Sequence, residues 1–312
     1  MIRTVTPNPS FDLTYEVGVF SLGEVNRAAR VTTAAAGKGV NVARNAVANG
    51  FPASAVIPAA SADAEVFAAE LAAVGVGLDV VDRPESVRRN ITITERNGTT
   101  TKLNEMGEPL SPEAVAALRR RAAAGDAATV AACGSLPPGV GPSFFAELAE
   151  AVREPETRLA LDTSGAALKA CLDVPCAVVK PNREELEDLI EDRLETYGDL
   201  VDVAGDLVRR GWRNVLVSLG PAGAVLVNSA GAWGGRAPTD EVVNTVGAGD
   251  ALLTGFLCGG PEPDAALASA LAFGRATVRS AMTAGAIVSE ADRGAVELFP
   301  VVTTDSLGEE TG

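Results

Sequence analysis

The sequence of 312 residues contains no histidine at all. A Ser-His or Cys-His catalytic pair is therefore excluded, and so is any metal site that depends on histidine ligands. If the protein is an enzyme, its general base must be a carboxylate, a lysine, a tyrosine or a cysteine, because these are the other side chains that commonly transfer protons.

Long apolar runs and paired cysteines are also missing. No stretch approaches the ~20 consecutive apolar residues of a membrane span. The opening residues, MIRTVTPNPSFD, lack the charged and apolar regions of a secretory signal. The nearest two cysteines are spaced C-x4-C, which is not a zinc spacing. We therefore predict buried, reduced thiols in a cytoplasmic protein. The four cysteines are Cys133, Cys171, Cys176 and Cys258.

Basic residues are scarce: 26 Lys and Arg stand against 41 Asp and Glu, which gives a formal charge of −15. Nucleic acid is excluded as the main partner, because neutralising phosphates needs a basic surface. Only four of the basic residues are lysines. The acidic excess suggests adaptation to a high-salt cytoplasm. A high-GC genome would explain the preference for arginine, but not the acidity.

What the sequence does contain is a regular alternation of short apolar runs with alanine-rich helical patterns. The apolar runs predict strands at 2–6, 53–58, 128–133, 158–162, 176–180 and 214–219. Helices are predicted at 38–49, 63–74, 111–124, 143–153, 183–190, 197–210, 249–258 and 263–281. Ser111 and Pro112 have the chemistry of a capped helix start. This order predicts an α/β protein of one large or two modest domains, with a mostly parallel sheet covered on both faces.

Two segments, 14–33 and 87–103, alternate polar and apolar residues instead, and the second contains an Asn97-Gly98 turn. This pattern predicts hairpins in a small sheet with one solvated face. A sheet of this kind, inserted into an α/β domain, serves as a lid or an interface. The tail at 303–312, TTDSLGEETG, is predicted to be disordered.

The strongest local signal is NTVGAGDALLTGFL at 244–257, in which two glycines bracket Ala248 and Asp250 opens an apolar helix. Small residues let the backbone approach an anion, and the first amides of the helix point toward it. The alternative is that Asp250 merely favours a helix start, as many aspartates do.

A second glycine motif lies far upstream, in AAAGKGVNVARNAVANG at 34–50. It is not a P-loop, because Val40 follows GKG where a P-loop has Ser or Thr. The alternative is a plain glycine turn with a solvated Lys38. If both glycine turns lie at one sheet edge, two anion sites face each other, as the transfer of a phosphoryl group requires.

Taken together, these motifs and five others resemble the PfkB, or ribokinase-like, family of sugar kinases, in order and spacing from about residue 2 to 300. The other motifs are TPNPSFDLT (6–14), CGSLPPG (133–139), LDTSG (161–165), VKPNREELE (179–187) and VSLGPAGA (217–224). The resemblance implies a ribokinase-like three-layer α/β sandwich with a mostly parallel central sheet and a small β-sheet lid. It also implies a single kinase domain over 1–312, with lid segments at about 12–33 and 86–104.

Within the family, the PNPSFD start, GEVNR at 23–27 and the R-x-N at 88–90 are most similar to 1-phosphofructokinases. The resemblance implies transfer of a phosphoryl group from ATP to fructose 1-phosphate, giving fructose 1,6-bisphosphate, with Mg²⁺ as cofactor. Tagatose-6-phosphate kinase, 6-phosphofructokinase and ketohexokinase activities are alternatives within the family. A non-catalytic sugar-phosphate sensor is the alternative from another class. The exposed face of the lid suggests a homodimer.

For the chemistry, the resemblance implies that Asp250 is the base that accepts the proton of the sugar hydroxyl. It also implies that the amides of Gly247, Ala248 and Gly249 hold the developing anion.

For the sugar, the family pattern assigns contacts to Asp12, to Ser135 and to the glycine motif: Gly37, Lys38, Gly39 and Asn41. Asp12 could instead form an Asx turn, and Ser135 could be a simple turn residue. Arg88 and Arg27 would grip a phosphate on the substrate, although both could equally be solvated. The alignment with the family is ambiguous by one residue, so the phosphate contact could be Arg88 or Arg89. Because successive side chains of a strand alternate, these two would lie on opposite faces of the sheet.

For the nucleotide, the resemblance places Lys180, Asn182, Ser218, Gly220, Gly223, Thr245, Gly247 and Gly249 along the ATP groove. Glu185 would help to organise Mg²⁺, through water, or else be an ordinary residue of a first helical turn. Asp162 would join the charged network near the metal, or only cap the next turn. The helix at 273–281 would contribute to the adenine pocket.

Overall fold

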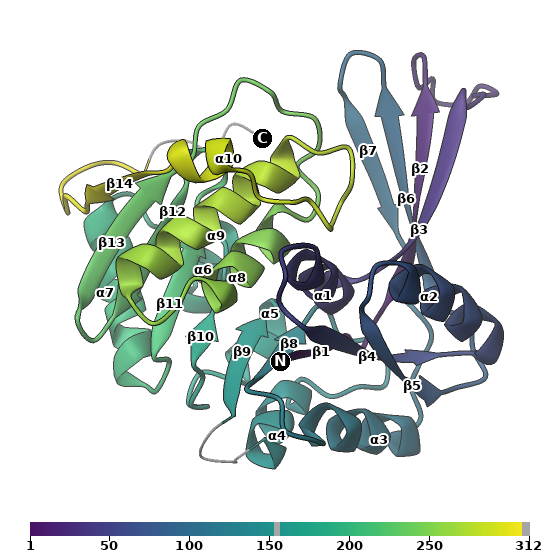
Figure 1. The fold of residues 1–312 in the computed structure, drawn as a ribbon, viewed down its shortest axis with the longest axis horizontal. Helices are drawn as coiled ribbons and strands as arrows, with labels where there is room; N and C mark the ends of the chain where they lie inside the picture. Colours follow the sequence, from purple (N-terminus) through teal and green to yellow (C-terminus); the bar gives the residue numbers. More distant parts are fainter. Residues whose placement is uncertain (153–156, 308–312) are drawn as a thin grey trace.

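The computed structural model describes residues 1–152 and 157–307, and within them a ten-stranded sheet forms the centre of the molecule (Figure 1). Its strand order is β14-β13-β12-β11-β10-β9-β8-β1-β4-β5. The strands are β1 (Ile2–Val5), β4 (Ala53–Ala59), β5 (Gly77–Asp82), β8 (Thr129–Cys133), β9 (Arg158–Asp162), β10 (Val178–Val179), β11 (Asn214–Ser218), β12 (Ala224–Asn228), β13 (Gly231–Arg236) and β14 (Glu297–Pro300). All six predicted strands are present, which confirms that the apolar runs are strands buried on both faces.

The sheet is parallel from β11 to β5 and antiparallel from β11 to β14. The antiparallel edge is absent from the sequence-based expectation. In β13 the glycines obscure the strand pattern, yet the packing requires them, since a Cβ at Gly234 would clash with the ring of Phe299 on β14. A mostly parallel sheet is therefore confirmed, with an added antiparallel edge.

Helices cover both faces of the sheet and make three layers. One face carries α1 (Lys38–Ala48), α2 (Ser61–Ala73), α8 (Ala248–Cys258) and α9 (Pro263–Val278). The other carries α3 (Pro112–Ala123), α4 (Phe144–Ala151), α5 (Gly165–Lys169), α6 (Arg183–Ile190) and α7 (Tyr197–Arg209). The short α10 (Glu290–Gly294) follows α9. The predicted helices all occur, and Ser111 caps α3 by accepting from the Ala114 amide. Residue 153, the last of the predicted 143–153 helix, lies outside the described residues.

A separate four-stranded sheet rises from the main body at the right of Figure 1, in the order β3-β2-β6-β7. Its strands are β2 (Ser10–Val17), β3 (Arg30–Ala36), β6 (Arg88–Glu95) and β7 (Thr100–Asn104). The strand register sorts its side chains: Ser10, Asp12, Arg88 and Asn90 share a polar face. The opposite face is apolar, and its Phe11 packs on Phe67 of α2.

The prediction of a disordered tail is wrong for residues 303–307. Leu307 is buried and its amide donates to the Glu195 carbonyl, while Asp305 accepts from the amide of Tyr197. A polar composition concealed these backbone bonds to the start of α7. Residues 308–312 of the tail lie outside the described residues.

All four cysteines are free thiols, as the sequence predicts, but only Cys133, Cys171 and Cys176 are buried; Cys258 is half-buried. Among the described helices, none has both the length and the apolar character that a membrane crossing requires.

Candidate active site

Four of the predicted motifs meet at the carboxyl ends of the parallel strands, where α/β proteins usually bind ligands. Asp162 ends β9 and Lys180 directly follows β10. From the helical side, Gly37 precedes α1 and Gly247 precedes α8. The two glycine motifs therefore open two helices at one edge of the sheet, as the sequence analysis expects.

A buried ion cluster forms the centre of this edge. Lys38 Nζ lies 2.7 Å from Asp162 Oδ1, and Lys180 Nζ lies 3.3 Å from Asp162 Oδ2. Glu185 Oε1 is 4.0 Å from Lys38 Nζ. Burial opposes the ionisation of Asp162, but Lys180 and Lys38 outweigh it and hold the pKa of this carboxyl below its usual value. Asp162 is thus a charged member of the network and not only a turn cap.

Asp250 lies beside this cluster at the start of α8 and accepts a hydrogen bond from Asn41 Nδ2 at 2.8 Å. Burial, and then the charge of Asp162, raise the pKa of Asp250 to about 7, although Lys38, Asn41 and Lys180 pull it down. A carboxyl with a pKa near 7 is well matched to proton transfer at neutral pH. The geometry brings together an acceptor for a proton and the charges that would control it.

Two other candidate bases near Asp250, Cys133 and Lys38, are held in their protonated forms. Burial and the nearby carboxylates raise the pKa of the Cys133 thiol well above its ordinary value. Burial disfavours the charged form of Lys38, but the carboxylates of Asp162, Asp250 and Glu185 outweigh it and raise the pKa of this ammonium group. Of these three groups, the carboxyl of Asp250 is the one suited to accept a proton near neutral pH.

The glycines at the start of α8 allow neighbouring groups to approach its backbone closely. Gly247 has φ +82°, a left-handed conformation that favours glycine. A Cβ at Gly249 would lie 3.4 Å from Lys180 Nζ, which places the ammonium group against the first turn of the helix. The Ala248 amide donates to the Thr245 carbonyl at 3.3 Å, so this member of the predicted anion site already has a partner.

The start of α1 is equally close-packed. Gly37 has φ +134°, and a Cβ there would lie 2.8 Å from the Thr6 methyl. A Cβ at Gly39 would lie 2.5 Å from Thr6 Oγ1 and 3.2 Å from Thr4. Both glycines allow the helix to sit directly on the end of β1, and this packing sets the positions of Lys38 and Asn41.

The polar face of the small sheet carries a second group of predicted residues. Asp12 Oδ1 accepts from Ser10 Oγ at 2.8 Å and from Asn90 Nδ2 at 3.0 Å. Arg88 pairs with Ser10 across the strands and faces Asp12. Its Nε and the Asn90 Oδ1 are buried and have no hydrogen-bond partner among the described residues. This arrangement leaves a donor and an acceptor unpaired, while Arg88 Nη1 donates to the Glu105 carbonyl at 3.0 Å.

The structure resolves the one-residue ambiguity between Arg88 and Arg89. The side chain of Arg89 points to the opposite face of the sheet and is exposed, whereas Arg88 is half-buried beside Asp12. Burial lowers the pKa of the Arg88 guanidinium, although Asp12 and Glu105 oppose this. Sequence reasoning gave no role to Ser10 or Asn90. The alternation of β2, which puts Ser10 on the face of Asp12, could have found the first, whereas Asn90 reaches that face only through the pairing of β6 with β2.

Two predicted sugar contacts, Arg27 and Ser135, lie outside both the ion cluster and the polar face of the small sheet. Arg27 is exposed in the loop between β2 and β3, and within the described residues no contact joins it to Arg88 or Lys38. Ser135 Oγ accepts from Asn8 Nδ2 at 3.2 Å, and this amide also donates to the Met106 carbonyl. Ser135 thus has a structural partner near the base of the small sheet.

On the nucleotide side, Asn182 and Glu185 form a reciprocal capping box at the start of α6. Glu185 Oε2 accepts from the Asn182 amide at 2.9 Å, so this carboxylate has a structural task, while its Oε1 lies toward Lys38. Ser218 ends β11 and pairs with Asn182. Gly220 and Gly223, both with positive φ, shape the next turn, and Thr245 is exposed before α8.

The carboxylates suit a magnesium ion that is held mostly by water and phosphate. Among the described residues, no group of three or more Asp, Glu or Cys side chains could enclose a metal ion. Mg²⁺ in phosphoryl-transfer sites characteristically uses one or two carboxylates and keeps several waters. Glu185, with Oε1 free of a hydrogen bond and beside the lysines, fits such a supporting role.

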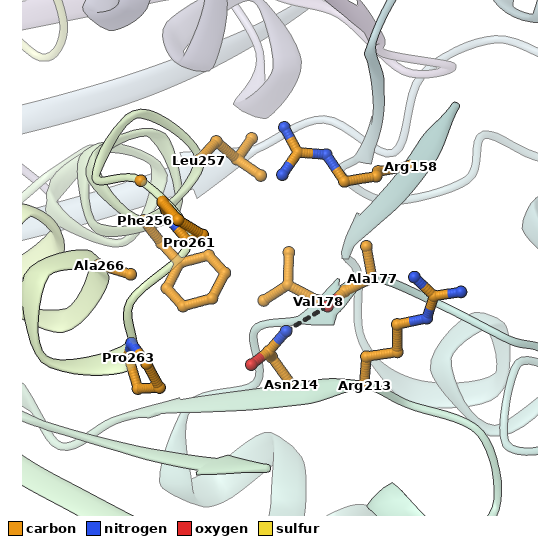
Figure 2. A pocket seen from close by; sticks show the side chains of 11 residues that line it. Arg158, Ala177, Val178, Arg213, Asn214, Phe256, Leu257, Pro261, Pro263 and Ala266 are labelled. Carbon is orange, nitrogen blue, oxygen red and sulfur yellow. Dashed lines mark hydrogen bonds between the residues drawn. The ribbon is translucent and has the colours of Figure 1, made fainter. Parts of the chain in front are cut away.

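A cavity of about 140 Å³ lies at the amino ends of β10 and β11, beside the end of α8 (Figure 2). This is the side of the sheet away from Asp250. Val178, Asn214 and Phe256 are among its lining residues. None of the predicted site residues lines this cavity. The candidate active site is therefore the open edge that carries Asp250, not this pocket.

The model of the pfkB family carbohydrate kinases matches residues 5–289. The chain belongs to this family. Among curated PfkB-type relatives, a 1-phosphofructokinase of Rhodobacter capsulatus is 38% identical over 261 residues, 82% of each chain. A 1-phosphofructokinase of Haloferax volcanii is 35% identical over 312 residues, 100% of this chain and 98% of the relative. The solved phosphofructokinase-2 of Escherichia coli has a TM-score of 0.87 at 28% identity and covers 94% of this chain and 96% of its own.

The PfkB match and the structural likeness confirm the family and the fold that the motifs indicate: a three-layer α/β sandwich with a second, smaller sheet. The seven motifs are spread over the length of the chain, and the family match extends over the same length.

Proposed function

We propose that this PfkB kinase transfers a phosphoryl group from ATP to the 6-hydroxyl of fructose 1-phosphate, giving fructose 1,6-bisphosphate. The observation that carries the proposal is the polar face of the small sheet, where the buried Arg88 Nε and Asn90 Oδ1 lack partners beside Asp12. In a chain of charge −15, Arg88 makes no ion pair among the described residues, although Asp12 and Glu105 lie near it, and such a cation suits an anionic substrate. The two curated relatives named above, from Rhodobacter capsulatus and Haloferax volcanii, are 1-phosphofructokinases.

The chemistry at Asp250 follows from its surroundings. As the sugar hydroxyl attacks the γ-phosphate, its proton passes to Asp250, which Asn41 holds in place. The amides at the start of α8 and the ammonium groups of Lys38 and Lys180 stabilise the charge that builds up on the transferring group. Asp162 keeps both lysines in position.

ATP would lie along the groove that follows β10 and β11, with Lys180, Asn182, Ser218, Gly220 and Gly223 beside it and Thr245, Gly247 and Gly249 near its phosphates. The apolar Val242 and Val243, in the segment before α8, and Met282, after α9, are exposed and would suit the adenine ring. Mg²⁺, with Glu185 in support, would neutralise charge on the phosphates.

The substrate contacts comprise Asp12, Gly37, Lys38, Gly39, Asn41, Arg88 and Ser135. Arg27 belongs to this set by its place in the family pattern, and its loop would have to approach the sheet edge. A ketohexokinase would leave the free Arg88 donor without a purpose. A non-catalytic sensor would have no use for a buried carboxyl whose pKa is about 7.

The direct test is turnover of ATP with fructose 1-phosphate, fructose 6-phosphate, tagatose 6-phosphate and fructose. We expect fructose 1-phosphate to have the highest kcat/KM. A lead for either 6-phosphate would reassign the substrate within the family. A lead for free fructose would make the protein a ketohexokinase, and no turnover with any of them would support the sensor.

We further propose that residues 1–312 form a single cytoplasmic kinase domain and that two copies associate through the small sheet, whose segments at about 12–33 and 86–104 serve as a lid. The apolar face of this sheet leaves Val31 49% and Leu103 58% exposed, and an apolar face of this kind favours association. We expect Leu103→Glu to halve the mass measured by light scattering. Thr100→Glu is the matched change on the polar face of the same strand, and it should leave the mass unchanged. An unchanged dimer, or a monomeric wild type, would contradict this interface.

A further inference from the structure

Three asparagines form a stripe along α1. Asn41, Asn45 and the capping residue Asn49 are spaced four residues apart, so they lie one above the other on the same side of the helix. Asn41 donates to the catalytic carboxyl of Asp250. The other two, which no part of the proposed mechanism uses, continue this line toward the far end of the helix.

Asn45 and Asn49 bind the backbone of the segment 283–288, which joins α9 to α10 and passes beside α1 in Figure 1. Asn45 Oδ1 accepts from the Gly285 amide at 2.7 Å, and Asn49 Oδ1 accepts from the Val288 amide at 2.9 Å. Asn49 Nδ2 donates to the Ala286 carbonyl at 3.0 Å. Because this segment has neither helix nor strand bonds, side chains must satisfy its buried backbone groups.

The same segment supports the start of α8. A Cβ at Gly247 would clash with the carbonyl oxygen of Thr283, so the two backbones are in close contact. A shift of the segment would therefore move Gly247 and the helix start against which the transferring phosphoryl group is expected to lie. Asn45 is only 1% exposed among the residues of the core, which leaves little room for another arrangement.

We propose that Asn45 and Asn49 are positioning residues: they hold the segment 283–288 against α1 and thereby keep the anion-binding start of α8 in register with the sugar-binding start of α1. The single helix α1 would then position both reactants. Asn41 would act through the base, Asp250, and Asn45 and Asn49 would act through the segment 283–288. This inference rests on the proposed kinase function, because it needs a phosphoryl group to be held at Gly247.

The test uses Asn49→Ala, because Asn49 is only half-buried and lies at the end of the helix. A small displacement of a reacting group is costly, so kcat should fall about 10-fold or more. The KM for the best acceptor in the sugar panel should change less than about 2-fold, since no sugar contact is removed. Asn49→Asp keeps the acceptor for the Val288 amide and should recover part of the loss.

The matched control is Asn214→Ala, which removes an asparagine bond of the same kind at the opposite edge of the sheet. Asn214 Nδ2 donates to the Ala177 carbonyl at 2.8 Å, the dashed line in Figure 2. We expect wild-type kcat in this variant. Equal losses of kcat in both variants would show a general loss of structure and overturn the proposal.

A second readout measures the anion site itself. ADP with aluminium fluoride and the best acceptor imitates the transferring phosphoryl group, and its binding should weaken about 10-fold in Asn49→Ala while binding of ADP alone stays the same. A wild-type kcat, an unchanged affinity for aluminium fluoride, or a loss confined to the KM of the sugar would overturn the proposal. Choosing the acceptor by assay keeps this test valid if fructose 1-phosphate is not the substrate.

Discussion

At the scale of the residue, the account depends on Asp250 as the base. Asp250→Asn preserves the shape of the side chain and removes its ability to accept a proton. We expect kcat to fall by roughly 10²–10⁴, with little change in the KM of the sugar phosphate. Wild-type turnover in this variant, measured by release of ADP, would remove Asp250 from the mechanism.

The raised pKa of Asp250 has a consequence for pH dependence. Below about 7 the carboxyl is protonated and cannot act as a base, so kcat/KM should fall about tenfold for each further pH unit. Asp162→Asn removes a negative charge that raises this pKa and should move the acid limb to lower pH. The phosphate of the substrate titrates in the same way in the assays of wild type and of Asp162→Asn. A shift of the acid limb between the two proteins therefore reports the pKa of Asp250. An acid limb that stays in place would show that another group controls the rate.

Single residues were predictable from the sequence where a motif is contiguous. Gly37 with Lys38, and Gly247 with Asp250, each lie within one helix start, and local spacing is enough to find them. The roles of Asn90 and Asp162 depend on how strands pair and on which side chains meet across the sheet. The order of residues along a single strand does not contain that information.

At the scale of the element, α6 and α7 offer a matched pair of helix starts. Asn182 caps α6 and Thr196 caps α7, each with a reciprocal capping box. Asn182→Ala and Thr196→Ala should each cost about 1 kcal/mol of the free energy of unfolding. Only Asn182→Ala should also raise the KM for ATP, because Thr196 is not among the proposed nucleotide contacts. Equal KM values in the two variants would limit Asn182 to its cap.

Elements were predictable where their periodicity is clear. Buried parallel strands such as β8 and β11 are continuous apolar runs, and α6 and α7 between them begin with capping boxes. The antiparallel edge was missed because the glycines of β13 serve close packing, which only the folded sheet shows. The end of the chain was missed because residues 303–307 are held by backbone bonds to α7, to which their polar side chains give no clue.

At the scale of the whole molecule, the charge of −15 implies self-repulsion between carboxylates. If it is an adaptation to high salt, molar KCl should raise Tm by screening this repulsion. Sucrose at matched osmolality controls for general exclusion of solute from the surface. A Tm that is flat from low salt to molar KCl would leave the composition without a stabilising role at high salt.

In the proposed mechanism, the polar face of the small sheet recognises a phosphate already present on the sugar. The most direct measurement is kcat/KM for fructose 1-phosphate and for fructose in Arg88→Ala, with Arg89→Ala as control on the opposite face. Charge-assisted hydrogen bonds contribute about 1.5–3 kcal/mol each, so Arg88→Ala should lose about 10–100-fold with fructose 1-phosphate. Fructose should be a poor substrate throughout and unaffected, and Arg89→Ala should match wild type. Equal losses with both sugars, or none with fructose 1-phosphate, would contradict the claim.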